Sequence, residues 1–178
     1  QFYSPLSNQR GDSYGGDFNG RIKLLLDVVR AVRECMPEGM PLFVRISATD
    51  WVEGGWDSTQ SIELAFLLKD LGVDLIDVSS GGLVHNATIP VSPGYQVQFS
   101  AEIKKQVGIL TSAVGLITGA QQAADIVELG QADAVMLARE MLRNPRWAMQ
   151  AAEELGERID WPLQLERARR LKPRPSPQ

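Results

Sequence analysis

The chain has 178 residues and a formal net charge of −4, with 44% apolar and 22% charged residues. This composition is typical of a globular domain, and the slight negative charge argues against nucleic acid or an anionic membrane as a partner. The single cysteine, Cys35, excludes an intrachain disulfide and suits a reducing cytoplasm. The single histidine, His85, excludes a multi-histidine metal site. No apolar run approaches the roughly 20 residues of a membrane-spanning helix.

Strand and helix patterns alternate along the chain after a polar, turn-rich opening. Continuous apolar runs predict the strands, and apolar residues at helical spacing predict the helices. Asp57 and Thr118 each stand three residues before a glutamine, the capping pattern of a helix start, and Asn144-Pro145 begins the last helix. In chain order the expected elements are a loop over 1–17, a helix over 18–36, a strand over 42–47, a helix over 57–72, a strand over 73–79, a helix over 99–107, a strand over 109–114, a helix over 118–130, a strand over 134–138, a helix over 144–156 and a flexible tail over 169–178.

The order of these elements defines the fold class as α/β with a parallel sheet, because each of the four strands is followed by a helix. Since the strands are almost continuously apolar, we expect the sheet to be buried on both faces. Such a chain forms either an open sheet or part of a barrel, and a complete (β/α)8 barrel needs about 250 residues. The sequence therefore supplies half the strands of such a barrel.

Two residues stand at the carboxyl ends of predicted strands, where parallel α/β folds bind ligands. Gly115 follows the third strand, and Arg139 follows the fourth. A glycine lets backbone N–H groups approach an anion closely, and an arginine offers a bidentate donor to phosphate. The pair therefore predicts a phosphate site. The alternative is that Gly115 is a turn glycine and that Arg139 pairs with Glu140 or another carboxylate.

Arg45 lies in the middle of the first predicted strand, between Val44 and Ile46. A buried arginine costs several kcal/mol unless it is paired, so we expect Arg45 to have a partner. One interpretation is an ion pair with Asp77 or Asp50. The other is a fixed cation that faces an anionic ligand.

Several short motifs follow one another in a fixed order along the chain. They are Ser-Pro-Leu-Ser-Asn over 4–8, Tyr-Gly-Gly over 14–16, Val-Arg-Ile-Ser-Ala-Thr-Asp-Trp over 44–51, Asp-Val-Ser-Ser-Gly-Gly over 77–82, Pro-Gly-Tyr-Gln-Val over 93–97 and Ala-Val-Gly-Leu-Ile over 113–117. Together they resemble the Old Yellow Enzyme-type flavin reductases, and within them the thermophilic-like, xenobiotic reductase-like branch. The resemblance covers nearly the whole chain and corresponds to strands five to eight of that family's (β/α)8 barrel.

The resemblance implies a function and a set of site residues. Its members bind one FMN non-covalently and pass a hydride from NAD(P)H through the flavin to an activated alkene. The resemblance assigns Arg45 to the pyrimidine edge of the flavin, where a cation stabilises the reduced anion. It assigns the backbone around Gly115, with Ala138 and Arg139, to the FMN phosphate. In this branch a C-terminal arginine reaches the active site of the neighbouring subunit, and Arg167 is the matching residue.

The chain departs from the family pattern at several positions. Ala138 stands where the family usually has glycine, Leu165 where it has an aromatic residue, and Gly20 where it has asparagine. The substrate-anchoring histidine pair, the proton-donating tyrosine and the flavin-tuning cysteine of the family all lie upstream of the matching segment. We therefore expect no catalytic residue and no metal ligand within these 178 residues.

The sequence leads to one main hypothesis and one rival. The main hypothesis is that residues 1–178 form the carboxyl-terminal half of the FMN-binding barrel of an NAD(P)H-dependent ene-reductase, working in the cytoplasm on a small activated alkene. Four βα units cannot close a barrel, so the expected partner is a second copy of the chain or the amino-terminal half. The rival is a half-barrel without catalysis of its own, which binds flavin or phosphate or serves in assembly.

Overall fold

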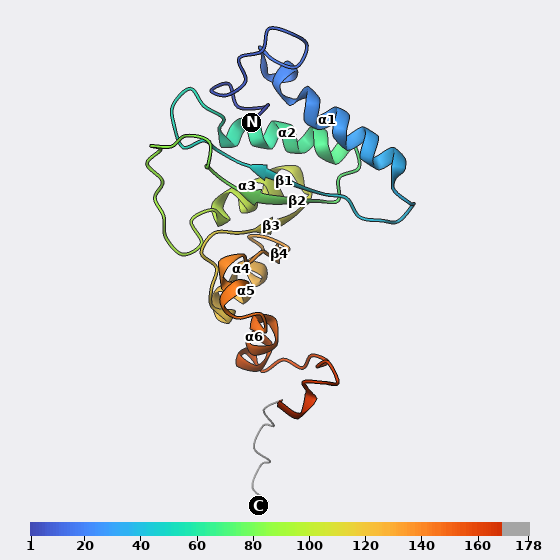
Figure 1. Ribbon diagram of the computed structural model, residues 1–178, viewed down its shortest axis with the longest axis vertical. Coiled ribbons are helices and arrows are strands. Elements are labelled where there is room, and N and C mark those ends of the chain that lie inside the picture. The colour runs from blue at the N-terminus through green and yellow to red at the C-terminus, as the bar shows by residue number, and fades with distance from the viewer. Residues whose placement is uncertain (169–178) are drawn as a thin grey trace, which may run out of the picture.

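The computed structural model describes residues 1–168, and the predicted flexible tail over 169–178 lies outside them. In chain order the elements are α1 (Phe18–Cys35), β1 (Phe43–Ser47), α2 (Ser58–Asp70), β2 (Leu75–Ser79), α3 (Val97–Val107), β3 (Leu110–Ala113), α4 (Ala120–Glu128), β4 (Ala134–Val135), α5 (Arg139–Arg143), α6 (Trp147–Leu155) and the short 3-10 helix η1 (Glu166–Ala168). Figure 1 shows α1 and α2 lying along one side of the sheet, with α4, α5 and α6 following toward the C-terminal end.

The sheet is parallel throughout, with strand order β1-β2-β3-β4. Sequential parallel strands require a crossover connection, which α2, α3 and α4 supply in turn. The predicted alternation of strands and helices is thereby confirmed, and so is the α/β class. Because all four strands run the same way, their carboxyl ends lie at one edge of the sheet.

The two faces of the sheet have different surroundings. One residue in two of β1 and β2 faces α1, α2 and α3 in one apolar core, whose strand members are Val44, Ile46, Ile76 and Val78. On the opposite face Phe43 and Leu110 are each 53% exposed. The expectation of a sheet buried on both faces therefore holds for β2, where Leu75 and Asp77 of this second face are also buried, but not for β1 or the start of β3. Helices cover the first face, and the second is open at Phe43, Arg45 and Leu110. In a closed barrel that second face would line the interior.

Helix starts agree with the sequence where a side chain caps them. Asp57 accepts a hydrogen bond from the N–H of Gln60 (2.9 Å), as the capping pattern predicts. The pattern at Thr118 is wrong: Gly119 is the N-cap of α4 without any side-chain cap, and the N–H of Thr118 donates to Oε1 of Gln122. The last helix begins at Trp147 rather than at Pro145.

One helix escaped the sequence analysis altogether. The helix α5 contains five residues, too few for apolar spacing to repeat. It begins directly at Arg139, so the arginine predicted to follow a strand in fact opens a short helix. The fourth strand is correspondingly shorter than expected, with only Ala134 and Val135 in the ladder.

No helix within residues 1–168 is both long enough and apolar enough to cross a membrane.

Candidate functional site

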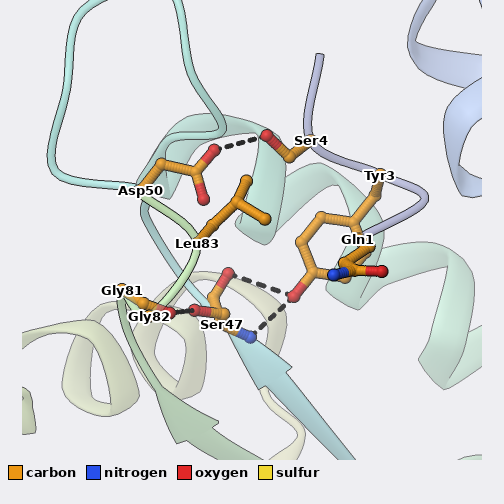
Figure 2. Close-up of a pocket in the computed structure, with 8 residues that line it drawn as sticks. All are labelled: Gln1, Tyr3, Ser4, Ser47, Asp50, Gly81, Gly82 and Leu83. Atoms are coloured by element: carbon orange, nitrogen blue, oxygen red, sulfur yellow. Dashed lines mark hydrogen bonds between the residues drawn. The ribbon is translucent and has the colours of Figure 1, made fainter. Parts of the chain in front are cut away.

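A small pocket lies at the carboxyl ends of β1 and β2 (Figure 2). Its volume is about 170 Å³, and it is lined by Gln1, Tyr3, Ser4, Ser47, Asp50, Gly81, Gly82 and Leu83. That volume is below the roughly 300 Å³ at which sites for small organic ligands begin. The pocket contains none of the predicted phosphate-binding residues.

The polar groups around this pocket are hydrogen-bonded to one another. The hydroxyl of Tyr3 accepts from the N–H of Ser47 (2.8 Å) and lies 3.3 Å from its carbonyl, and the hydroxyl of Ser4 donates to the buried Asp50 (2.6 Å; Figure 2). Burial raises the pKa of Tyr3, with the hydrogen bond to Ser47 opposing it. These contacts fix the opening segment of the chain onto the end of β1. The motif over 4–8 was the only sequence signal for this role.

The turn after β3 has an unusual backbone. Gly115 has φ = +120°, and Leu116 follows with φ = +52°, a left-handed conformation that side chains other than glycine and asparagine seldom adopt. A Cβ on Gly115 would also lie 2.6 Å from Nε2 of Gln96. Gly115 is therefore required both for its φ and for the space beside it.

The same turn exposes backbone donors. The carbonyl of Val114 accepts from Nε2 of Gln96 (3.0 Å), and the carbonyl of Gly115 accepts from the N–H of Gly94 (2.9 Å). In a trans peptide the following N–H points opposite to the carbonyl. The N–H groups of Gly115 and Leu116 therefore point away from residues 94–96, and no acceptor within residues 1–168 meets either of them.

Arg139 lies near this turn without a carboxylate partner. Ala113 and Val135 are opposite each other in the sheet, so Gly115 and Arg139 follow neighbouring strands by two and four residues. Glu140, the partner that the alternative interpretation named first, pairs instead with Arg143 at 3.2 Å. Within the described part of the chain the guanidinium of Arg139 has no ion pair or hydrogen bond, and the side chain is exposed. Ala138, beside it, is exposed as well.

Arg45 has a different environment from the expected one. Its Nε donates to Asp77, which is 7% exposed, and Ser112 donates to the other oxygen of the same carboxylate (2.7 Å). The predicted ion pair with Asp77 is present, but Arg45 is not buried: its side chain is 62% exposed on the open face of the sheet. Its two terminal nitrogens meet no acceptor among residues 1–168, which leaves them available to an anion.

The remaining candidates do not join this group. Arg167 lies in η1 and is exposed, and its role in a neighbouring subunit stays a prediction. Within the described residues, no group of three or more histidine, cysteine or acidic side chains could hold a metal ion. Sequence reasoning missed Gln96, which contacts the turn at Val114 and Gly115. Its place in the motif over 93–97 was the one available signal.

Parallel strands whose ends carry free backbone N–H groups and a free arginine are typical of phosphate-binding βα barrels. The sequence pattern of the NADH:flavin oxidoreductase / NADH oxidase family matches residues 1–158, and the chain belongs to that family. Membership confirms the predicted family, the barrel fold class, and the cofactors FMN and NAD(P)H.

Curated relatives agree with this assignment. The chain is 50% identical over 168 residues to an NADPH dehydrogenase of Listeria innocua, and 49% identical over 171 residues to one of Geobacillus thermodenitrificans. These matches cover 94% and 96% of this chain and 49% of each relative. The chain therefore spans about half the length of the curated relatives it matches.

Solved structures support the fold. The chain superposes on a 2-naphthoyl-CoA reductase with a TM-score of 0.77 at 23% identity, covering 86% of this chain and 24% of that one. It superposes on a histamine dehydrogenase from Rhizobium sp. 4-9 with a TM-score of 0.71 at 24% identity, covering 86% and 22%.

Proposed function

We propose that residues 1–178 supply the FMN-phosphate half of an NAD(P)H-dependent ene-reductase barrel. One observation carries this proposal: two unpaired backbone N–H groups at Gly115 and Leu116 follow a strand adjacent to the one that Arg139 follows. Successive N–H groups form an anion site, and a guanidinium adds charge-assisted hydrogen bonds to phosphate. Ala138 is exposed, so its methyl group does not fill a buried position that the phosphate would need.

Each residue of this half would act by binding and orientation. The N–H groups of Gly115 and Leu116 and the guanidinium of Arg139 would hold the phosphate. Arg45, fixed through Nε by Asp77, would present its terminal nitrogens to the flavin ring. The chemistry that bound FMN would supply is hydride transfer between NAD(P)H and an activated alkene. We propose the alkene as substrate class on the resemblance to the ene-reductase branch.

Loss of the Arg139 guanidinium tests the phosphate site. We expect Arg139→Ala to weaken FMN binding about 10- to 100-fold, the value of one or two charge-assisted hydrogen bonds. Riboflavin, which lacks the phosphate, should bind the variant and the unaltered chain alike. Fluorescence titration with both flavins measures the two effects.

Arg143→Ala is the matched control for Arg139→Ala. It lies four residues further along α5 and, within residues 1–168, forms one exposed ion pair, with Glu140, which contributes at most about 1 kcal/mol to stability. Its FMN affinity should stay unchanged. Equal FMN affinities for Arg139→Ala and Arg143→Ala would remove Arg139 from the site.

Arg45 offers a separate test through the redox potential. We expect Arg45→Leu to lower the midpoint potential of the bound flavin, because the reduced anion loses a cation and the Asp77 carboxylate loses its partner. Arg45→Lys should keep most of the original potential, since it preserves the charge. Spectroelectrochemistry of the flavin-loaded protein measures the shift. If the midpoint potential is the same in all three proteins, Arg45 does not act on the flavin, and its role is the ion pair with Asp77.

The rival function is supported by the open face of the sheet. Within the described chain, β1 and β4 each have a neighbouring strand on one side and an unpaired edge on the other. On the face between these two edges, Phe43 and Leu110 are exposed to solvent. Exposed strand edges and apolar surface promote association. We therefore propose that the face pairs with a complementary half-barrel or a second copy. In such an assembly Arg167 would reach a neighbouring active site.

We also propose that the protein works in a reducing cytoplasm, which suits the free, exposed Cys35.

A further inference from the structure

A chain of side-chain hydrogen bonds joins the carboxyl ends of three strands. After β1, Nε1 of Trp51 donates to the hydroxyl of Ser80 (2.9 Å), which follows β2. The hydroxyl of Ser80 donates to Oε1 of Gln96 (2.6 Å), and Nε2 of Gln96 donates to the carbonyl of Val114 (3.0 Å), which follows β3. The side-chain amide of Gln96 is thus bonded at both its oxygen and its nitrogen.

Gln96 is well enclosed for a polar side chain. It is only 4% exposed, and it lies against the face of Gly115 where a Cβ would be, 2.6 Å from that position. A buried amide must be hydrogen-bonded to offset its loss of hydration. Because Gln96 satisfies this requirement through Ser80 and Val114, its position and the direction of the Val114 carbonyl are determined together.

The backbone is strained at one end of this hydrogen-bonded chain, Trp51, and two residues beyond the other end, at Leu116. Trp51 has φ = +62° and Leu116 has φ = +52°, conformations that cost of order 1 kcal/mol or more and persist only where the surroundings enforce them. Strain of this kind clusters at ligand-binding sites. Here the strained Leu116 carries one of the two free N–H groups, and the neighbouring Val114 carbonyl is bonded to Gln96.

We propose that Gln96 is a positioning residue of the phosphate site. By accepting from Ser80 and donating to Val114, its side chain turns the Val114 carbonyl inward and so directs the N–H of Gly115 outward, toward the phosphate. The N–H of Gly94 holds the carbonyl of Gly115 in the same way (2.9 Å), and so directs the N–H of Leu116 outward. The proposal rests on the proposed function, since it assumes that these N–H groups bind the FMN phosphate.

The test compares FMN with riboflavin on the full 178-residue chain. Gln96→Met keeps the length of the side chain and removes both hydrogen bonds. We expect it to weaken FMN binding about tenfold, the value of one to two neutral hydrogen bonds, while riboflavin affinity changes less than about twofold. The ratio of the two dissociation constants therefore falls. A purely structural role for Gln96 would weaken both flavins equally and leave that ratio unchanged.

Two further variants make the outcome unambiguous. Gln98→Met, two residues further along the chain in α3, removes an exposed amide that donates, among residues 1–168, to the carbonyl of Tyr95 (3.3 Å), and its ratio should equal that of the unaltered chain. Ser80→Ala removes the hydrogen bond to Oε1 of Gln96, together with the one from Trp51, but leaves the bond from Gln96 to Val114, so the ratio should fall by a smaller factor. This variant decides the matter if Gln96→Met does not fold.

The results separate this inference from the proposed function. If the unaltered chain prefers FMN to riboflavin and neither Gln96→Met nor Ser80→Ala reduces that preference, the positioning role of Gln96 is wrong and the phosphate site stands. If the unaltered chain binds both flavins equally, or neither, the proposed function is wrong and the inference falls with it.

Discussion

We expect Gly115→Ala to raise the dissociation constant for FMN by at least about 30-fold, the value of two hydrogen bonds of about 1 kcal/mol each. Alanine cannot adopt φ = +120° without strain, and its Cβ would lie 2.6 Å from Nε2 of Gln96. The turn or Gln96 must therefore move, and both free N–H groups lose their direction at once. Fluorescence titration with FMN measures the affinity, and thermal unfolding measures the accompanying loss of stability.

Gly119→Ser is the matched control for this substitution. Gly119 lies four residues further along the same connection, has an ordinary φ of −97°, and has no atom within 4 Å of the position a Cβ would take. As the N-cap of α4 it also accepts serine well. FMN affinity should be unchanged in this variant. A Gly115→Ala protein that binds FMN as tightly as Gly119→Ser would show that the turn does not contact the phosphate.

The second large effect concerns turnover. We expect residues 1–178 alone to reduce 2-cyclohexenone with NADPH at least about 100-fold more slowly than the same chain supplied with the preceding half of a family barrel. That factor is the lower end of what a positioned proton donor contributes, and the resemblance places the histidine pair and the tyrosine in the preceding half. The open face with Phe43 and Leu110 is where that half would pack.

The assay uses the amino-terminal half of the Listeria innocua NADPH dehydrogenase, expressed separately and mixed with this chain. NADPH oxidation is followed with and without the enone. Each half alone should be nearly inactive, and the mixture containing Arg139→Ala should regain less activity at limiting FMN. Rapid enone reduction by residues 1–178 alone would refute the assignment of essential chemistry to the other half. A mixture that forms a stable, flavin-loaded complex without any turnover would favour the non-catalytic rival.

The local pattern of the sequence was enough to predict most of the elements. Hydrophobic spacing predicts a helix or strand wherever the element is long enough to show its period, as in α1 and β2. The Asp57 cap was predictable because its bond to Gln60 spans three residues and depends on local backbone alone. The helix α5 was not predictable, because its five residues are too few to show a repeating pattern. The start of α4 was not predictable either, because its N-cap, Gly119, has no side chain to mark it.

The candidate site divides in the same way. Gly115 and Arg139 could be proposed from the sequence, because a residue that follows a predicted parallel strand must lie at the ligand-binding edge of the sheet. The sequence could not predict that Arg139 does not pair with Glu140, because Glu140 reaches Arg143 only through the helical turn of α5. The exposure of Arg45 depends on which face of the sheet the helices cover, a question that concerns the packing of α1 and α2 rather than any residue near Arg45.

By itself the sequence determined the α/β order, the parallel sheet, the family and the residues at the strand ends, because each of these follows from local periodicity, motif order or position next to a strand. Only the tertiary structure decided how the turn at Val114, Gly115 and Leu116 is held. Trp51, Ser80, Gln96 and Val114 are separated by 16 to 29 residues along the chain and meet only because three parallel strands end side by side. Contacts of that kind form only when the strands pair in the folded protein, and no local sequence pattern encodes them.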